Sequence, residues 1–471
     1  MRFHASMLIG EVIPELYRYL STNPLAAEKS EFSHVLVDEF QDLNKAEQGI
    51  LELLSGAADV CIVGDDDQSI YSFKHAHPEG IRDWLLANVG ATDLGLADCQ
   101  RCPTRVVEMA NALIAHNVQR PVPRVLNPLP AKGPGDVRII QYVSLNAEVT
   151  AIVTMIQQMM AAGTPARDIL VLAQSRAIGT PIFQALQATG VPARSEYTES
   201  ELESLVAQRA FALLKLLADQ NDRVALRWLV GSNNATFNAA GYRRVRGHCE
   251  LTGLSPWEVL SRLSAGTLTL PFTGPIMTAF DEVTADLAVL AALPDVPAVV
   301  DFLFPAGQNS TLQIRTTATG MLAANPAVDL QTLVSELVTA ITQPEIPSDV
   351  QEVRIMSLHK SKGLSSPVTI VAGCVNGLLP RPVKSPVTPA ERLAHDEEQR
   401  RLFYVGITRV KSDPANGKPG TLILTYSQQM PMADAMRAGI SPAYSSYGIA
   451  VLQASPYIAE MAPAAPAAIA G

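Results

Sequence analysis

Two short apolar segments that each end in acidic residues constrain the fold more than any other feature of the sequence. The segments HVLVD at 34–38 and DVCIVGD at 59–65 are separated by NKAEQGILELLSG at 44–56. In the middle segment Asn44 can cap a helix, and Glu47 stands at the reciprocal position of a capping box. Strand, helix and strand at this spacing predict a parallel βαβ unit that is covered on both faces.

The same pattern of strands and helices returns further along the chain, is interrupted, and then resumes. From about 199 to 345 the periodicity is that of helices, and no strand there ends in an acidic residue. We therefore expect a helical insertion within a second α/β domain. The predicted strands of that domain are 136–143, 168–174, 352–359 and 367–374, and its predicted helices are 146–163 and 179–189.

The composition allows several domains and favours a chain without a membrane partner. A chain of 471 residues with 48% apolar residues can form roughly two to four domains. The most apolar window, 283–304, is interrupted by acidic residues and prolines, and residues 1–10 lack the apolar run of a signal peptide. The net charge of −10 argues against a surface coated with basic patches but is compatible with a local nucleic-acid groove.

Five cysteines are scattered along the chain, which indicates a reducing compartment and so a cytoplasmic location. Two of them, Cys99 and Cys102, form a CxxC motif. Zinc needs a second pair of ligands, and none stands at a suitable spacing. A redox role stays open, because Pro103 could begin a helix directly after the motif. An incidental pair of small residues is the simpler interpretation.

Acidic residues follow both strands of the first predicted unit: Asp38 and Glu39 after one, and Asp65, Asp66 and Asp67 after the other. In open α/β sheets, ligands collect at the carboxyl ends of the strands. Carboxylates gathered there repel one another unless a cation or a basic group compensates them. Because Mg²⁺ takes one or two carboxylates plus phosphate oxygens, a phosphoryl-transfer site explains the cluster. Taken alone, the Asp-Glu pair is more simply explained as a turn or helix cap.

Five motifs occur in one order along the chain, and together they resemble motifs II to VI of the superfamily 1 DNA helicases of the UvrD/Rep/PcrA kind. The resemblance extends over residues 1–430. It implies an α/β fold with two RecA-like parallel-sheet motor domains, the first incomplete, and a mainly helical insertion in the second. The motifs are VDEFQD at 37–42, GDDDQSIYSFKHA at 64–76, RCPTRVVEMANALIAHN at 101–117, MSLHKSKGL at 356–364 and EEQRRLFYVGITR at 397–409.

The resemblance also implies a division of the chain into domains. The helical stretch falls where this family inserts its second accessory domain. The end of the chain, MAPAAPAAIAG at 461–471, is expected to be disordered, because Ala and Pro dominate it. The implied parts are 1–95 for the incomplete first motor domain with motifs II and III, 96–198 and 346–430 for the two parts of the second motor domain, 199–345 for the helical accessory insertion, and 431–471 for a low-complexity tail.

The resemblance implies ATP and Mg²⁺ as cofactors and gives roles to individual residues. Asp38 resembles the acid that binds Mg²⁺. Glu39 resembles a second ligand of the metal and the general base that orients the attacking water. Gln68 resembles the residue that senses the γ-phosphate. Arg101 and Arg409 resemble two arginine fingers, whose permanently charged planar groups stabilise charge on the transferring phosphoryl group.

Further residues match positions that contact DNA or nucleotide in this family. Phe73 and Lys74 match an aromatic residue and a basic residue that contact single-stranded DNA. A base stacked on an aromatic ring contributes about 1–3 kcal/mol, and a lysine neutralises a phosphate. Ser357 and His359 match motif V positions near the DNA backbone, although His359 could also be a buried structural histidine. Gly363 belongs to the nucleotide-binding positions. The implied partners are single-stranded DNA and DNA junctions.

The sequence departs from the family pattern in two motifs. Motif IV, usually NYRS, here reads Cys99-Gln100-Arg101-Cys102, so that the arginine remains but the aromatic residue that stacks on the adenine does not. Motif V, usually SKGLEF, has Ser365 in place of the acid that contacts the ribose. Both changes should weaken nucleotide binding.

A third departure is larger, because no GxxxxGK[ST] motif occurs in the 471 residues. The Gly417-Lys418 pair is followed by proline and lies after motif VI. The backbone cradle and the lysine for the β- and γ-phosphates are therefore missing. We expect a chain that begins within the first motor domain and is inactive alone. Either its first domain is poorly folded, or a separate N-terminal chain with the P-loop completes it. Apolar surface and open strand edges around 34–63 should then be exposed.

Three functions are compatible with these observations. The first is an ATP-driven helicase that translocates 3′→5′ on single-stranded DNA, in a truncated or split form. The second is a non-catalytic DNA-binding or protein-interaction module derived from a helicase. A Mg²⁺-dependent nuclease is the weakest, because it leaves Gln68, Arg101 and Arg409 unexplained. The motor interpretation requires Glu39, Gln68, Arg101 and Arg409 to face one cleft.

Overall fold

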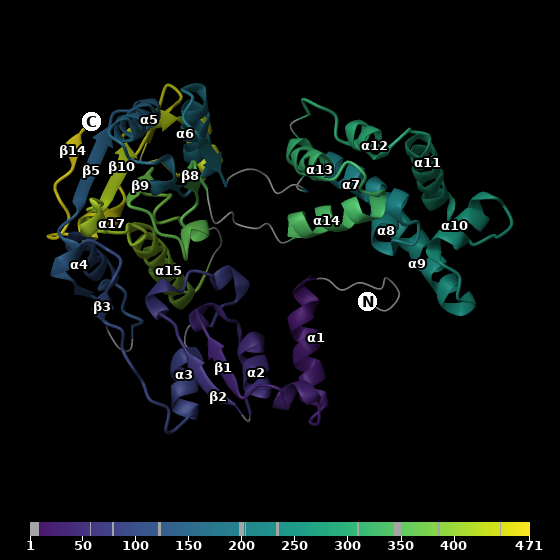
Figure 1. Ribbon diagram of the computed structural model, residues 1–471, viewed down its shortest axis with the longest axis horizontal. Coiled ribbons are helices and arrows are strands. Elements are labelled where there is room, and N and C mark those ends of the chain that lie inside the picture. The colour runs from purple at the N-terminus through teal and green to yellow at the C-terminus, as the bar shows by residue number, and fades with distance from the viewer. Residues whose placement is uncertain are drawn as a thin grey trace. The chain divides into compact units, whose positions relative to one another are not determined.

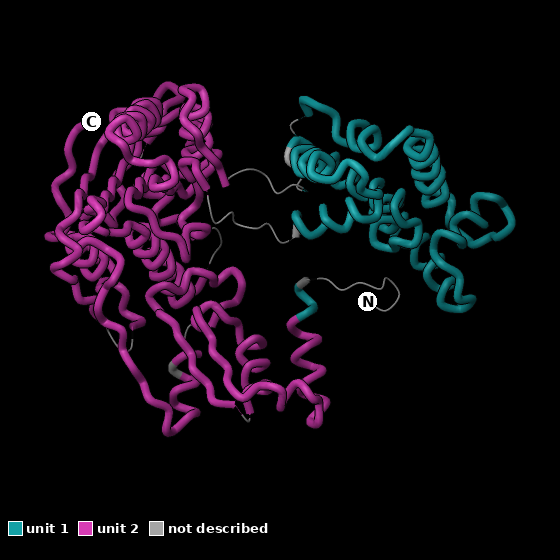
Figure 2. Tube along the Cα trace, in the orientation of Figure 1, with its two compact units in different colours: residues 1–12, 199–348 teal, residues 13–198, 349–471 magenta. Residues whose placement is uncertain are grey.

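The chain divides into two compact units (Figure 2). One is helical and contains Glu199–Ser348 together with Met1–Val12, and the other is α/β and contains Ile13–Thr198 together with Asp349–Gly471. Each unit has a hydrophobic core. The computed structural model describes residues 9–56, 58–77, 80–120, 124–196, 202, 204–231, 235–308, 310–342, 350–383, 387–442 and 444–471.

A seven-stranded sheet forms the centre of the α/β unit (Figure 1). All of its neighbouring strands are parallel. The four strands predicted for the second α/β domain are all in this sheet, as β5, β6, β8 and β9. In their order across the sheet, the strands are β14 (Ile469–Ala470), β5 (Asp136–Tyr142), β10 (Thr421–Ser427), β9 (Val368–Ala372), β6 (Ile169–Ala173), β8 (Val353–Met356) and β7 (Ala193–Ser195).

The order of the strands determines which helices cover which face. The connections through α5 (Leu145–Ala161) and α6 (Arg176–Ala188) both cross the sheet in one direction, from β5 to β6 and from β6 to β7. The connection through α15 (Pro389–Ile407) runs the opposite way, from β9 to β10. Because such crossovers are right-handed, α5 and α6 cover one face and α15 covers the other (Figure 1).

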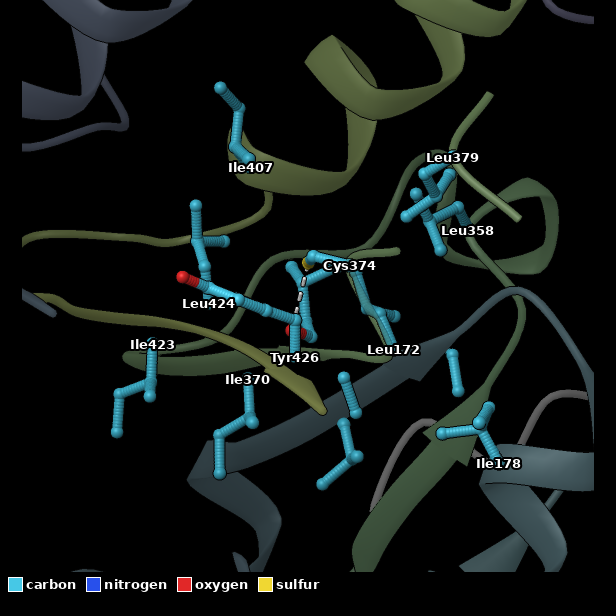
Figure 3. Packing of buried hydrophobic residues seen from close by; sticks show 14 of the residues in the cluster. Leu172, Ile178, Leu358, Ile370, Cys374, Leu379, Ile407, Ile423, Leu424 and Tyr426 are labelled. Carbon is cyan, nitrogen blue, oxygen red and sulfur yellow. Dashed lines mark hydrogen bonds between the residues drawn. The ribbon is translucent and has the colours of Figure 1, made fainter. Parts of the chain in front are cut away.

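The central strands of this sheet are buried on both faces. Every residue of β6 (ILVLA) and β9 (VTIVA) is buried, as expected for continuous apolar runs in a parallel sheet. Figure 3 shows Leu172 of β6, Ile370 of β9 and Leu424 of β10 among the packed side chains. Full burial of one such side chain contributes about 1.5–3 kcal/mol, so these strands contribute a large share of the apolar stabilisation of the unit.

The segment before residue 96 has a much smaller sheet. Strands β1 (His34–Val37) and β2 (Asp59–Ile62) pair in parallel and form a sheet of two strands. Between them lies α2 (Lys45–Leu54), with the predicted capping box of Asn44 and Glu47. The apolar surface expected around 34–63 is exposed: Leu36 is 80% exposed and Val63 48%. The other helices of this segment are α1 (Ile9–Thr22) and α3 (Gly80–Ala87).

The C-terminal segment corrects one prediction, because its described residues, 431–442 and 444–471, form helices and strands and not a low-complexity tail. Alanine and proline content suggested a segment without a core, but Tyr457 and Met461 are buried in the main core. Strand β14 pairs with β5 at the edge of the large sheet. The remaining elements of this segment are β11 (Gln429–Pro431), α16 (Met432–Ala438), β12 (Tyr444–Ser446), β13 (Ile449–Val451) and α17 (Pro456–Glu460), with β11, β13 and β12 forming a small antiparallel sheet.

A short parallel pair of strands surrounds motif IV. Strand β3 (Asp98–Cys99) pairs with β4 (Asn127–Pro128), and α4 (Thr104–Ile114) lies between them in the sequence. Helix α4 packs against α15 and places six buried side chains in the main core. The turn with Arg101 therefore connects a strand to a well-packed helix.

The helical unit contains the residues whose periodicity predicted helices. Its core includes Phe280, Phe304 and Leu333, and the Trp257 ring meets Phe280 edge-on at 4.9 Å between centroids. Its helices are α7 (Leu205–Ala218), α8 (Arg223–Gly231), α9 (Ala235–Thr252), α10 (Pro256–Ser264), α11 (Gly274–Ala291), α12 (Val296–Leu303), α13 (Leu312–Ala324) and α14 (Leu330–Thr342). In the described part of the chain, none of the helices combines the length and the apolar character needed to cross a membrane.

Candidate functional site

The first strand ends at the two adjacent acids, and the backbone turns sharply there. Glu39 has a φ of 53°, in the left-handed region that few residues other than glycine adopt. Its backbone N–H donates to Asp38 Oδ1 at 2.8 Å. Such backbone strain at the carboxyl end of a strand is a common feature of functional sites.

Gln41 connects the two acidic loops. This side chain lies in a short 3₁₀ helix, η3 (Phe40–Asp42), and is completely buried. Its Nε2 donates to Glu39 Oε2 at 2.6 Å, and its Oε1 accepts from the backbone N–H of Asp65 at 3.0 Å. The acids after β1 and after β2 are therefore held at a fixed separation.

Lys362, from motif V, supplies the positive charge that the acidic cluster needs. Its Nζ donates to both carboxylate oxygens of Asp42, at 2.8 and 2.7 Å, and to the carbonyl of Gln68 at 2.8 Å. The same Nζ lies 3.4 Å from Glu39 Oε2, and the lysine side chain is only 6% exposed. Burial raises the pKa of Asp42, and the hydrogen bond from Lys362 opposes that shift.

Gln68 contacts the arginine of motif VI. Its Oε1 accepts from Arg409 Nη2 at 3.4 Å, while its Nε2 donates to Asp65 Oδ2 at 2.8 Å. Gln68 lies in η4 (Asp66–Gln68), directly after β2, and Arg409 follows α15. The contact therefore joins the small sheet to the large one at the acidic cluster.

Arg409 is almost completely enclosed, with 1% of its surface exposed. Its Nε donates to the carbonyl of Val405 at 2.8 Å and its Nη1 to the carbonyl of Leu364 at 3.2 Å. Burial, and to a smaller extent the nearby charge of Arg101, lower the pKa of Arg409 to about 10. The guanidinium stays charged at neutral pH. Glu39, Gln68, Arg101 and Arg409 thus lie in one region, with Lys362 among them.

The predicted DNA-contacting residues of motif III lie beside motif V. Phe73 is 64% exposed, and its ring centroid lies 5.7 Å from that of Tyr71 and 6.0 Å from that of His359. The Tyr71 hydroxyl donates to the His359 carbonyl at 3.3 Å, and Lys74 Nζ lies 4.7 Å from the Tyr71 ring centroid. Burial lowers the pKa of His359, which favours the neutral ring at pH 7. Together these residues form an exposed aromatic face with a lysine beside it.

Ser357 and Gly363 lie on the same segment after β8 but make different contributions. Ser357 Oγ accepts from the backbone N–H of Lys360 at 3.3 Å, in the turn that begins η8 (His359–Ser361). Gly363 is exposed with a φ of 81°, and a Cβ there would meet open space. The backbone conformation, and not lack of room, therefore requires glycine at this position.

Three further contacts connect the segment before residue 96 to the second α/β domain. The backbone N–H and the hydroxyl of Ser72 donate to the Glu398 carboxylate at 2.8 and 2.6 Å. Arg401 Nε donates to the carbonyl of Ser69 at 2.8 Å. Asp67 accepts two hydrogen bonds from Arg120, at 2.7 and 2.5 Å. These contacts come from motifs III and VI and from Arg120, three residues after motif IV, and they surround the same site.

The two acids after β1 fit a Mg²⁺ ion that arrives with a nucleotide. Among the residues that the structure describes, no group of three or more His, Cys, Asp or Glu side chains is arranged to bind a metal. Mg²⁺ in nucleotide sites uses one or two carboxylates, and phosphate oxygens and water complete its coordination. Asp38 and Glu39 provide such a pair at an exposed edge, so they suit a shared ion better than a permanent metal centre.

Sequence reasoning missed Lys362, Asp42 and Gln41. Lys362 stands beside Gly363 in motif V, but its partner Asp42 is 320 positions away in the sequence. A charged residue in a loop is usually solvated, so no local pattern indicates a buried ion pair. The usable signal for Gln41 was its place between Glu39 and Asp42 in the motif VDEFQD.

The parallel sheets and the converging motif residues agree with the resemblance to the superfamily 1 helicases, and comparisons with known proteins point the same way. Residues 7–84 match the UvrD/REP helicase N-terminal domain, and residues 315–414 match the UvrD-like helicase C-terminal domain. Two separate parts of the chain are therefore similar to the N- and C-terminal domains of UvrD-like helicases.

Curated relatives match most of this chain. DNA helicase II of Haemophilus influenzae is 26% identical over 427 residues, which cover 85% of this chain and 57% of the relative. DNA helicase II of Escherichia coli is 26% identical over 425 residues, with 85% and 56% covered. The ATP-dependent DNA helicase PcrA of Staphylococcus epidermidis is 23% identical over 428 residues, with 85% and 56% covered. The chain therefore spans a little over half the length of these relatives.

Proposed function

We propose that this chain provides the acidic residues and the arginines of the ATP site in a motor. This motor hydrolyses ATP and translocates on single-stranded DNA in the 3′→5′ direction. Glu39 is the general base, Asp38 and Glu39 bind Mg²⁺, and Arg101 and Arg409 stabilise charge on the phosphoryl group. Gln68 connects the nucleotide to the DNA side, and the turn at Gly363 borders the nucleotide. Phe73, Lys74, Ser357 and His359 contact the DNA strand, which can be part of a junction.

The observation that supports this proposal most is the direct contact of Gln68 with Arg409. These residues come from motifs III and VI, and their side chains meet at 3.4 Å beside the Glu39–Lys362 pair. A nucleotide between them would replace this long hydrogen bond with shorter contacts to phosphate oxygens. Glutamine would then report on the phosphate, which is the chemistry that coupling to a DNA site requires.

Turnover also needs a phosphate cradle, and the 471 residues contain no GxxxxGK[ST] motif. Lys362 is engaged with Asp42 and Glu39 and lies on the acid side of the site, so it does not replace the P-loop lysine. We therefore propose that this chain alone does not hydrolyse ATP. The missing cradle comes from outside these 471 residues, for example from a separate chain.

The test is ATP turnover in the presence of Mg²⁺ and single-stranded DNA. The chain alone should give no turnover, and a fusion with a strand–GxxxxGK[ST]–helix unit should give DNA-stimulated turnover. In the fusion, Glu39→Gln should lower kcat by about 10²–10⁴-fold, because it removes the base and keeps the shape. Glu52→Gln, on the exposed side of α2, is the matched control and should have no effect.

Each other result has a clear meaning. Turnover by the unfused chain would contradict the need for an external cradle. A fusion that hydrolyses ATP equally well with Glu39→Gln would contradict the assignment of the general base. A fusion that translocates 5′→3′ would contradict the direction but not the motor.

A non-catalytic DNA-binding module is the second candidate, and one observation favours it. The acidic cluster already has a counter-cation in Lys362, so it is electrostatically satisfied without nucleotide. This candidate predicts binding of single-stranded DNA by the unfused chain. Phe73→Ala should then weaken binding by about 1–3 kcal/mol and Lys74→Ala should reduce the salt dependence, whereas Phe32→Ala should change neither.

A further inference from the structure

The cysteines of the CxxC motif lie at a junction of structural elements. Cys99 ends strand β3, and Cys102 precedes Pro103, which caps α4. The two side chains are neighbours across this turn, and each one shifts the pKa of the other. Cys99 is half-buried and Cys102 is 1% exposed. An oxidant in solvent can therefore reach the Cys99 sulfur, while the Cys102 sulfur is buried.

Cys102 connects this pair to the arginines. Its Sγ lies 3.4 Å from the carbonyl of Thr408, the residue before Arg409. The single S–H proton can serve either this carbonyl or the Cys99 sulfur, but not both at once. Arg101 lies between the cysteines in the sequence, and its carbonyl accepts from the N–H of Ser412 at 2.8 Å.

The charges around the pair divide the roles of the two thiols. The hydrogen bond from Cys102 lowers the pKa of Cys99 to about 5, and Arg101 contributes in the same direction. The bond to Cys99 and burial raise the pKa of Cys102 well above its usual range. Cys99 is therefore a thiolate at neutral pH, which is the nucleophilic form of cysteine, and Cys102 keeps its proton.

We propose that Cys99 and Cys102 form a reversible disulfide that acts as a redox-sensitive modification site beside the arginines. The Cys99 thiolate attacks a peroxide, and with one proton from solvent this gives a sulfenic acid and one water. The Cys102 thiol then attacks the Cys99 sulfur and releases a second water as the disulfide forms. Two thiols are oxidised and one peroxide is reduced. A disulfide such as oxidised glutathione can serve as the oxidant by thiol exchange.

The disulfide has two structural consequences. It closes a ring around Arg101 and fixes the backbone of this turn. It also removes the Cys102 S–H group, which is within hydrogen-bonding distance of the Thr408 carbonyl, next to Arg409. Neither consequence needs a nucleotide, so the proposal goes beyond the proposed function and can be tested without it.

Peptide mapping of the full chain tests the disulfide directly. Trypsin separates Asp83–Arg101 from Cys102–Arg105 in the reduced protein, because it cleaves after arginine. The native protein is treated with hydrogen peroxide or oxidised glutathione, then alkylated and digested. The two peptides should then be found linked by the disulfide, or as one peptide that is not cleaved after Arg101 and has a mass lower by two hydrogens. Dithiothreitol should separate them. Cys374, which is fully buried, is the internal control and should stay unmodified.

Two variants and a pH profile complete the test. Cys102→Ser should leave Cys99 able to form a glutathione adduct but no link, and Cys99→Ser should leave Cys102 unmodified. The alkylation rate of Cys99 should stay level between about pH 6 and 8, whereas that of free glutathione rises about tenfold per pH unit. Separate, singly alkylated peptides after oxidation of the wild-type chain would overturn the proposal. So would an alkylation rate of Cys99 that follows that of glutathione.

Discussion

The α/β unit contains two regions with parallel sheets, and these sheets differ greatly in the number of strands and in the burial of their side chains. The sheet of the second domain has seven strands, and its central strands are buried on both faces. The sheet before residue 96 has two strands, with Leu36 80% exposed. Even so, the acidic loops after the two-stranded sheet are held by defined hydrogen bonds.

The difference shows that charged contacts, and not a sheet, position the acidic loops. Lys362, Glu398, Arg401 and Arg120 all come from the region after residue 95, and each bonds a residue between 42 and 72. Only four hydrophobic side chains among the described residues before residue 96 are buried in the structure: Leu20, Phe40, Ile50 and Ile70. Of these, Ile70 belongs to the core of the large sheet. The site is therefore built on the second domain.

The largest expected difference between the regions is in the cost of losing a strand side chain. Ile370→Ala in β9 should lower the free energy of unfolding by about 2–5 kcal/mol, because it leaves a cavity at a completely buried position. Leu36→Ala in β1 should change it by less than about 0.5 kcal/mol. Urea unfolding, followed by hydrogen exchange of the β6 and β9 amides, measures both. A similar cost for the two variants would contradict the comparison.

The next effect concerns the buried lysine. Lys362→Ala leaves Asp42 and the Gln68 carbonyl without their shared donor, and it should loosen the loops by about 1–3 kcal/mol. Thermolysin should then cleave the native chain faster within residues 9–95, while the large sheet stays resistant. Lys360→Ala, at an exposed position two residues earlier, is the control. An unchanged cleavage rate for Lys362→Ala would mean that residues before 96 order the acidic loops without this lysine.

The smallest expected effect is on the pH dependence of the free energy of unfolding. Burial lowers the pKa of His359 below its usual value of 6.5, so the folded chain binds fewer protons than the unfolded chain in that range. The stability from this residue is complete above about pH 6.5 and is lost as the pH falls through the lowered pKa.

The variant His359→Gln should therefore lose less stability than the wild type between about pH 7.5 and 5.5, by at most about 1.4 kcal/mol per pH unit. The measurement is the urea midpoint at both pH values. His116→Gln, at an exposed position, should behave like the wild type. Equal pH dependence in His359→Gln and wild type would show that the ring titrates alike in both states.

The sequence predicted the elements whose signal is local. Continuous apolar runs indicated β6 and β9, and the pair Asn44 and Glu47 indicated the start of α2. These features need only the chain's own periodicity and capping chemistry. The C-terminal segment was predicted wrongly, because its order depends on Tyr457, Met461 and the pairing of β14 with a distant strand.

The site was predicted in its residues but not in its organisation. The motifs indicated Glu39, Gln68 and Arg409, and the structure places them close together. The central lysine was missed, because its contacts span about two thirds of the chain and depend on the fold of both sheets. The catalytic and DNA-binding roles of these residues remain predictions until turnover and binding are measured.

Hydrogen exchange in the double variant Lys362→Ala/Glu398→Gln tests most directly whether the second domain positions the acidic loops. Amides of residues 39–43 and 65–74 should exchange at least about tenfold faster than in the wild type, which corresponds to about 1.4 kcal/mol of lost local stability. Amides of β6 and β9 should be unchanged. Unchanged exchange in both loops would show that the two-stranded sheet orders them by itself, and would contradict this account of the site.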